Sequence, residues 1–190
     1  MTRLTGKAKD KKRKDNQKAK KIHRQRYLKS LRAEILTHDS SELSEVSVDL
    51  TKDDDVEFIQ KMKKVLCSTP YGVGLAANQI GETKRVIVLR TDSDSRLVKA
   101  MINPVILKKS DETEVRFEGC LSYPGEHCPI SRSLEVEVSY TDEKWAQKTG
   151  EFVGLEARIL QHEIDHLDGI CKVKDSSEAV ELNETSEQPT

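Results

Sequence analysis

The feature that most limits how this chain can fold is the segment 160–169, LQHEIDHLDG, in which two histidines stand four residues apart. On an α-helix this spacing puts His162 and His166 on one face, so both imidazoles can reach a single metal ion at about 2.0–2.1 Å. Glu163 follows the first histidine and can take a proton from a water molecule beside such an ion. The segment therefore predicts a helix that carries two metal ligands and a base.

The face of this helix that carries the ligands is otherwise apolar. Leu155 and Ile159 precede His162 and His166 at positions i, i+4, i+7 and i+11, which form one continuous face of a helix over 154–169. We therefore expect the ligands to share the apolar stripe that packs the helix against a sheet. The chain has to bury this helix, and the metal site with it, in its core.

Two histidines do not complete a metal site, so a third ligand is needed. Zinc endopeptidases with this motif commonly take it downstream, where this chain offers only glutamates of the acidic segment 175–190. Upstream, Cys120 lies in the turn-like segment 118–122 between two expected strands. A thiolate there would leave one position open for water, which is typical of catalytic sites. A closed, structural site completed by Cys128 or His127 is the alternative.

The rest of the hydrophobic pattern predicts one further core helix and several strands. Val56 to Cys67 carries apolar residues at helical spacing, and Thr51 is the expected N-cap of that helix. Gly72 and Gly74 begin a tight loop in which the backbone can pass close to another group. Strands are expected at 85–89, 97–106, 114–117, 134–140 and 151–153, and a brief extended piece at 171–174.

The charge of the chain is distributed unevenly. Residues 1–29 hold 13 Lys and Arg against two Asp, although the whole chain has a formal net charge of −1. We predict a basic extension at 1–29, disordered or a solvated helix, then a catalytic metallohydrolase domain at 30–174 and an acidic disordered tail at 175–190. The extension is interpreted as an electrostatic arm for RNA or DNA phosphates. The alternative is a solvated tail without a specific partner.

The four cysteines and the apolar runs indicate the compartment. None of the cysteines forms a C-x-x-C pair, and four in a chain of 190 residues are too few for a disulfide framework. Cys67 and Cys171 are expected to be small buried hydrophobic residues. No run approaches the roughly 20 apolar residues of a membrane span, and no signal peptide is predicted. We expect a reducing, cytoplasmic compartment and no membrane partner; an organellar transit peptide is disfavoured because the extension is rich in lysine and contains aspartate.

Three segments together carry a resemblance to a known family. GVGLAANQ at 72–79, EGCLS at 118–122 and QHEIDH at 161–166 are similar to the three signature motifs of peptide deformylase, in the family's order. The similarity covers roughly residues 35–172. It implies an α+β fold in which antiparallel sheets pack around a central metal-binding helix, with one further N-terminal core helix.

The resemblance also implies an activity, a cofactor and a set of site residues. The family removes the formyl group from N-formylmethionine of nascent polypeptides, using one divalent metal ion, most often Fe2+, with Zn2+, Ni2+ or Co2+ as substitutes. The implied metal ligands are Cys120, His162 and His166. Glu163 resembles the general base and acid. The implied oxyanion donors are the Gln79 side chain and the Leu121 backbone N–H; the substrate contacts are Val73, Gly74, Leu155 and Ile159; the supporting pair is Glu118 and Arg132.

The chain departs from the family pattern in three places. It resembles the short, virus-encoded members that lack the long C-terminal helix, which contributes to ribosome contact. The basic extension is not part of the family core, and it is expected to bind the ribosome or RNA in place of that helix. Arg116 and Arg158 lie where the family tends to place apolar residues around the methionine pocket. We expect a bacterial cell, or one infected by a virus, as the host.

Two other functions remain open at this point. The helix of 154–169 could serve a zinc endopeptidase, although the missing downstream ligand argues against it. The chain could instead be a nucleic-acid-binding protein with a structural metal site and the basic extension as its working part. The presence of Gln79, Leu121 and Glu163 argues against this second alternative, because a structural site needs no oxyanion donors.

Overall fold

Two antiparallel sheets form most of the protein. The computed structural model describes residues 6–54, 56–90, 97–175 and 180–181. One sheet has the order β1-β2-β3-β6-β7 and the other the order β4-β5-β8. The strands of the larger sheet are β1 (Gly74–Ala76), β2 (Val86–Arg90), β3 (Val98–Lys109), β6 (Glu135–Thr141) and β7 (Gln147–Val153). Those of the smaller sheet are β4 (Thr113–Cys120), β5 (Tyr123–Ser133) and β8 (Val180–Glu181).

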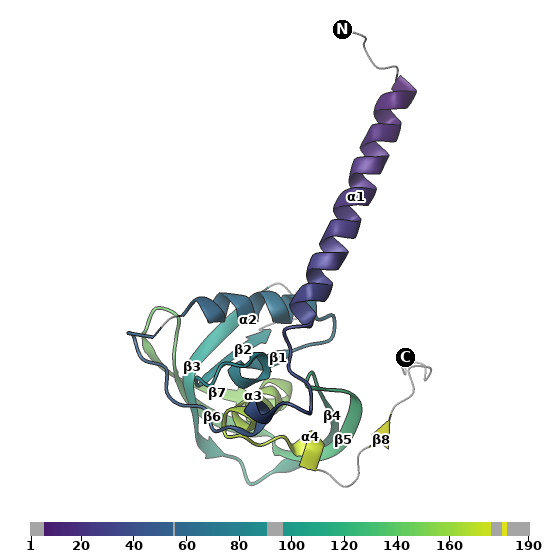
Figure 1. The fold of residues 1–190 in the computed structure, drawn as a ribbon. Helices are drawn as coiled ribbons and strands as arrows, with labels where there is room; N and C mark the ends of the chain where they lie inside the picture. Colours follow the sequence, from purple (N-terminus) through teal and green to yellow (C-terminus); the bar gives the residue numbers. More distant parts are fainter. Residues whose placement is uncertain (1–5, 55, 91–96, 176–179, 182–190) are drawn as a thin grey trace.

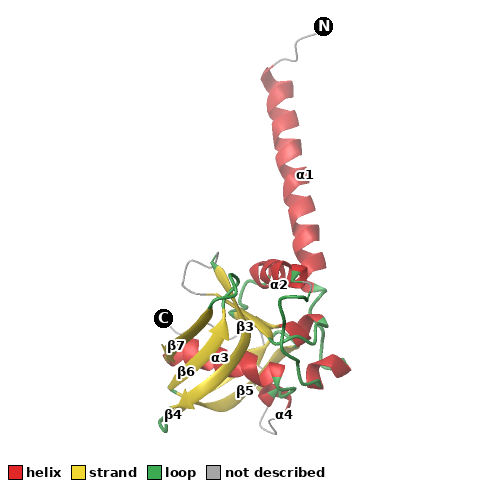
Figure 2. Cartoon of the chain, turned by 90° about the vertical axis from the view of Figure 1, so that its left-hand side faces the viewer, coloured by secondary structure: helices red, strands yellow, loops and turns green. Residues whose placement is uncertain are grey.

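Helices cover both faces of the larger sheet. Successive side chains of a strand point to opposite faces: Val86 and Val88 of β2 pack with helix α2 (Glu57–Ser68), whereas Ile87 and Leu89 pack with helix α3 (Gly154–Leu167). Figure 2 shows α3 enclosed by strands, and it contacts strands of both sheets. The described part of the fold is therefore the expected α+β arrangement, with antiparallel sheets around a central helix.

The face of α3 that packs on the larger sheet is not the one that we expected. Ala157, Leu160, Ile164 and Leu167 are the buried residues on it, together with Ile159. Leu155 is 59% exposed, so its expected packing against the sheet was wrong. The reason is that the face with His162 borders a cavity, which Leu155 in the first turn also lines.

Helix α2 confirms the predicted core helix but not its predicted cap. The helix begins at Glu57, and Val56 in the N-cap position makes no side-chain capping bond. Thr51 instead donates its backbone N–H and its hydroxyl to Oδ2 of Asp54, at 2.7 and 2.9 Å. Because this local turn satisfies the hydrogen-bonding groups of Thr51, the helix starts five residues later than a Thr51 cap would require.

Several strand boundaries also differ from the expectation. No strand was predicted at the position of β5, which contains Pro124, Gly125 and Pro129, residues that are unfavourable in strands. In the described sheet β8 pairs only with Glu126 and His127, so Pro129 lies in an edge segment, where proline is tolerated. The expected tight loop at 72–81 contains strand β1 and the 3₁₀ helix η2 (Ala77–Ile80). The extended piece expected at 171–174 is wrong, because helix α4 occupies Lys172–Asp175. A second 3₁₀ helix, η1, spans Ser41–Ser44.

Helix α1 (Gly6–Arg32) projects away from the sheets (Figure 1). Its rich content of Lys, Arg, Gln and Ala favours a helix, and it runs without a break across the boundary predicted after residue 29. Among the side chains of α1 that the structure describes, those at its base contact the core. Leu31 packs against the α2 cluster, Arg32 Nε donates to the carbonyl of Ser68 at 2.7 Å, and Glu34 beyond the helix pairs with Lys61 at 2.9 Å.

The ends of the chain lie largely outside the described residues. Residues 1–5 of the basic extension and most of the acidic segment 175–190 are among those not described, so the predicted tail is not assessed beyond β8 and the last residue of α4. In the described parts of the chain we find no helix both long and apolar enough to cross a membrane.

Candidate metal centre and active site

A thiol and two imidazoles meet between strand β4 and helix α3. Cys120 is the last residue of β4, and His162 and His166 lie one turn apart on α3. One ligand atom of each residue lies within 4.8 Å of the other two, and Cys120 Sγ is 3.2 Å from Nε2 of His166. Neither Cys128 nor His127 belongs to this cluster in the described structure; the thiol of Cys128 is directed to the carbonyl of Val173 instead, at 3.3 Å.

The chemical types of the three groups, one thiol and two imidazoles, suit a cation. Burial lowers the pKa of His166 to about 3, which leaves a neutral imidazole with a free lone pair. The hydrogen-bonded thiol of Cys171, together with burial, raises the pKa of the Cys120 thiol well above its usual value. A buried thiolate therefore needs positive charge beside it. A divalent ion among Cys120, His162 and His166 supplies that charge, so the donor set fits a metal ion that takes sulfur and nitrogen ligands.

The carboxylate of Glu118 orients His162. Glu118 Oε2 lies 2.9 Å from Nδ1 of His162, which leaves Nε2 of that ring available to a metal ion. Arg132 donates to both oxygens of Glu118, at 3.0 and 2.9 Å, so the expected pair is formed. Burial alone would raise the pKa of Glu118, but the hydrogen bonds from His162 and Arg132 outweigh it and lower the pKa to about 2. For His162 burial lowers the pKa, but the hydrogen bond to Glu118 and the negative charges of Glu163 and Glu118 together outweigh burial and raise the pKa.

Glu163 lies beside the triad in a water-poor position. It is 4% exposed and its Oε2 has no hydrogen-bond partner, and burial raises its pKa to about 7. Gly74 explains how strand β1 approaches so closely, since a Cβ added there would stand 2.3 Å from Oε1 of Glu163. The expected close passage of the glycine segment is therefore a passage across Glu163. Any larger residue at 74 would displace this carboxylate.

The amide of Gln79 points from η2 toward the thiol. Its Oε1 accepts from the backbone N–H of Ala76 at 2.9 Å, which fixes the side chain. Its Nε2 donates to the hydroxyl of Ser122 at 3.1 Å and lies 3.5 Å from Sγ of Cys120. The side chain is 2% exposed. An N–H donor is therefore held beside the Cys120 thiol.

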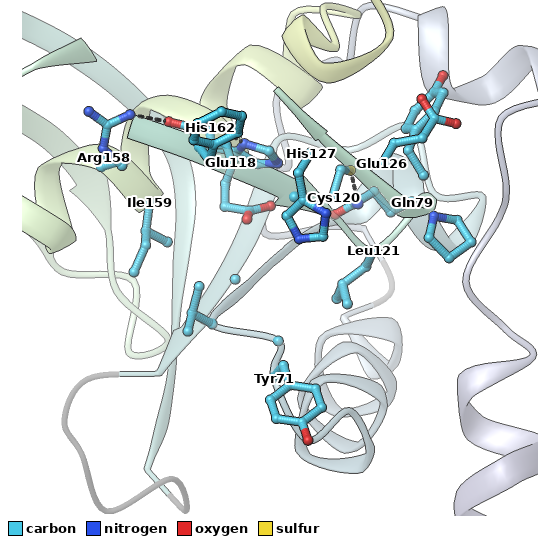
Figure 3. A pocket seen from close by; sticks show the side chains of 18 of the residues that line it. Tyr71, Gln79, Glu118, Cys120, Leu121, Glu126, His127, Arg158, Ile159 and His162 are labelled. Carbon is cyan, nitrogen blue, oxygen red and sulfur yellow. Dashed lines mark hydrogen bonds and ion pairs between the residues drawn. The ribbon is translucent and has the colours of Figure 1, made fainter. Parts of the chain in front are cut away.

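A cavity of about 560 Å³ opens beside these groups. This volume lies in the usual range for small-ligand sites. Figure 3 shows the labelled side chains of α3, of the β4–β5 hairpin and of the segment before β1 around it. The expected substrate contacts all line it, namely Val73, Gly74, Leu155 and Ile159, and so do Gln79, Glu118, Cys120, Leu121, His162 and Glu163. His166 is buried behind them, at 1% exposure.

The two arginines that depart from the family pattern have different positions. Arg116 does not line the cavity; its Nε pairs with Glu114 at 2.8 Å and its side chain is 54% exposed. The expectation that Arg116 lies around the methionine pocket is therefore wrong, because its strand turns it to solvent. Arg158 does line the cavity, but it is buried and hydrogen-bonded rather than extended to water.

Some residues of the site were not found from the sequence. Tyr71, Phe117 and Glu126 also line the cavity, and so does His127, which the sequence had offered only as a possible ligand of a closed metal site. Cys171 is buried, as expected, but it lies against Cys120, which no spacing rule indicates. Cys67 is exposed, so its expected burial was wrong.

Comparisons with known proteins agree on one family. The profile of the family described as polypeptide deformylase matches residues 32–180. A peptide deformylase of Natranaerobius thermophilus is 41% identical over 155 residues, which are 80% of this chain and 96% of that one. A peptide deformylase of Picosynechococcus is 42% identical over 123 residues, or 64% of this chain and 66% of that one. The crystal structure of the deformylase of the Vibrio parahaemolyticus bacteriophage VP16T, in complex with actinonin, is 38% identical, has a TM-score of 0.66, and is similar over 72% of this chain and 98% of that one.

Proposed function

The chain belongs to the polypeptide deformylase family, and we propose which of its side chains remove the formyl group from N-formylmethionyl nascent peptides. The protein is a peptide deformylase, a metal-dependent hydrolase. We assign the roles from one observation. Cys120, His162 and His166 come together beside the buried Glu163, next to a cavity that Gln79 also lines. Formate release from a formylated peptide tests it.

Glu163 is proposed as the group that moves the proton. Cys120, His162 and His166 would hold a divalent ion, which supplies a Lewis acid able to lower the pKa of water from about 15.7 towards about 7. Glu163 removes the proton from the attacking water and later returns it to the departing amine. Its pKa of about 7 suits both directions of transfer near neutral pH. Because its Oε2 has no protein partner, that oxygen is free to receive the proton.

Gln79 and Leu121 are proposed to stabilise the charge that grows on the formyl oxygen. The amide nitrogen of Gln79 lies beside the thiol of Cys120, and Leu121 follows this cysteine at the β4–β5 turn and lines the cavity. A fixed N–H donor aimed at a developing oxyanion needs no reorganisation during the reaction. Val73, Gly74, Leu155 and Ile159 would contact the methionine residue and the peptide backbone.

Replacing Gln79 with alanine tests this assignment. Losing one oxyanion donor typically costs about 2.7–4 kcal/mol, so we expect kcat for formate release to fall by about 100-fold or more. Gln60→Ala, on the exposed face of α2, is the matched control and should change nothing. Near-normal turnover of Gln79→Ala, with an unchanged melting temperature, would remove Gln79 from the mechanism.

Ferrous iron is the proposed metal. One thiolate, two neutral imidazoles and an open position accept Fe2+, Zn2+, Ni2+ or Co2+, and the similarity to the deformylase family favours Fe2+. The raised pKa of the buried Cys120 thiol means that a thiolate at this position needs a cation beside it, which supports a bound divalent ion.

Helix α1 is proposed to bring the enzyme to the ribosome or to other RNA. Gly6–Arg32 contains 13 Lys and Arg against two Asp, and every described basic side chain along it is exposed. A helix attached only at its base can lie along a phosphate backbone without blocking the cavity. Such binding releases counterions and weakens steeply as salt increases.

Deleting residues 1–29 tests the role of α1, because Leu31 and Arg32 at its attachment remain. We expect co-sedimentation with ribosomes to fall sharply at low salt, while kcat/KM for a free formylated tripeptide stays the same. A full-length variant with Lys14, Lys18 and Lys21 changed to glutamine should lose part of the binding, since it keeps the helix and lowers the charge. Ribosome binding that survives the deletion would end this proposal.

We place the enzyme in the cytoplasm of a bacterium or of a bacterium infected by a phage. Related sequences come from bacteria, and one related structure comes from a bacteriophage. All four cysteines are free thiols, which is consistent with a reducing compartment.

A further inference from the structure

A polar stripe on α3 connects the ligand-bearing helix to the ligand-bearing strand. Arg158, Gln161 and Asp165 lie at i, i+3 and i+7, beside the stripe of the two histidines. Gln161 bonds both the N–H and the carbonyl of Ser133, at 3.1 and 2.9 Å. Asp165 pairs with Arg132 of β5. The β4–β5 hairpin, which holds Cys120, is thus fastened to the helix that holds His162 and His166.

Arg158 makes the most extensive of these connections. Its Nη1 donates to Oε1 of Glu118 at 2.6 Å and to the carbonyl of Ile130 at 3.0 Å. Its Nη2 donates to the carbonyl of Glu114 at 2.6 Å. One side chain of α3 therefore reaches both strands of the hairpin. Its side chain is 9% exposed, so these bonds are shielded from solvent.

The charged groups of this cluster are paired with one another, and Lys172 also pairs with Asp165, at 3.6 Å. Arg132 and Arg158 face the carboxylates of Glu118 and Asp165. Removing one partner of a buried, hydrogen-bonded ion network leaves an uncompensated charge. Glu118 is the shared acceptor, and its two oxygens are divided between the arginines and His162. Its position therefore depends on all three neighbours.

The two arginines hold Glu118 against different elements. Arg132 belongs to β5, the strand paired with that of Glu118, so its fork fixes Glu118 within the hairpin. Arg158 belongs to α3, one turn before His162. It fixes Glu118 relative to the helix on which the imidazole is mounted. The bond from Arg158 to Oε1 and the contact of Oε2 with His162 Nδ1 then form one connected path.

We propose that Arg158 is a positioning residue for the metal centre, acting through Glu118 on His162 and through the hairpin on Cys120. This inference rests on the proposed metal site. Groups that hydrogen-bond a metal ligand fix its ring orientation, and their loss typically weakens metal binding by about 10–100-fold. The guanidinium is engaged by Glu118 and by the carbonyls of Ile130 and Glu114, so the arginine that lines the cavity is ion-paired and held in place. The methionine pocket can therefore remain selective for an apolar side chain.

Zn2+ affinity, measured by chelator competition on the full-length protein, is the direct test. We expect Arg158→Met, which keeps an apolar side chain of similar length, to bind Zn2+ about 10–100-fold more weakly than the unmodified protein. The visible absorption spectrum of the Co2+ form should change as well, because the ligand geometry changes. In steady-state assays kcat should fall while KM stays within about threefold. Arg158→Lys keeps the positive charge and one donor to Glu118, so its Zn2+ affinity should lie between those of Arg158→Met and the unmodified protein. Arg116→Met, on the exposed face of β4, is the matched control. Its Zn2+ affinity, Co2+ spectrum and kcat should equal those of the unmodified protein.

Equal Zn2+ affinity and an unchanged Co2+ spectrum in Arg158→Met would overturn the inference. If that variant does not fold, Arg158→Lys serves as the test in its place. A folded Arg158→Lys protein with the same Zn2+ affinity as the unmodified protein would contradict the positioning role of Arg158. A parent protein that binds no Zn2+ at all would instead contradict the proposed function, so the two failures are distinguishable.

Discussion

Changing Glu163 to glutamine is expected to lower kcat for deformylation by about 10³-fold while leaving metal binding intact. Acid–base catalysis by one side chain typically contributes about 10²–10⁴-fold, and Glu163 is assigned both the removal and the return of the proton. Glutamine has nearly the same shape, so it fits against Gly74, where even one added carbon would stand 2.3 Å from the carboxylate. Formate release and metal content should be measured on the same preparation.

The control for this change is Glu156→Gln, in the exposed first turn of the same helix. It removes one negative charge from α3 without touching the cavity, so activity should persist. Glu163 lies outside the set of three metal-ligating groups, which is why its loss should spare the metal. Loss of the metal in Glu163→Gln would mean that the carboxylate is a ligand; full activity would mean that it is not the base.

The second large effect is expected from Cys120→Ala, which removes one of three ligands. Metal affinity should fall by more than about 100-fold, beyond the range for groups that only support a ligand. Elemental analysis of the parent protein, purified without oxygen, should find about one metal ion per chain, with iron predominating. The variant should carry almost none and release no formate.

Cys67→Ala separates the loss of a ligand from the loss of a thiol. Cys67 is exposed at the end of α2, away from the cavity. Its replacement should keep both metal and activity. Retention of a full complement of metal in Cys120→Ala would show that the third ligand comes from elsewhere, and a parent protein that carries only zinc would contradict the assignment of iron.

Local patterns were sufficient to predict the elements that carry the chemistry. The spacing of His162 and His166 required a helix, and Cys120 between two expected strands supplied a thiol near it. The structure brings the three together. Gly74 was expected to let the backbone pass another group, and that group is Glu163. These predictions succeeded because helical periodicity and glycine geometry are local properties of a chain.

Features that depend on distant contacts could not be predicted in the same way. Leu155 follows the helical period of the ligand face, but only the tertiary fold decides that this face opens onto a cavity. Strand β5 forms despite Pro129 because its edge carries little pairing in the described sheet. The bonds of Arg158 to two strands join residues 28 to 44 positions apart in the sequence, and no local pattern encodes them.

The central claim is that the Cys120, His162 and His166 site, with Glu163, hydrolyses the formyl amide of a peptide. The most direct measurement is the incubation of N-formyl-Met-Ala-Ser with protein loaded anaerobically with Fe2+, followed by assay of formate and mass spectrometry of the peptide. We predict one formate for each intact Met-Ala-Ser produced. Cleavage of the internal peptide bonds would indicate an endopeptidase, and an unaltered substrate would indicate a binding protein with a structural metal; either result would contradict the assignment.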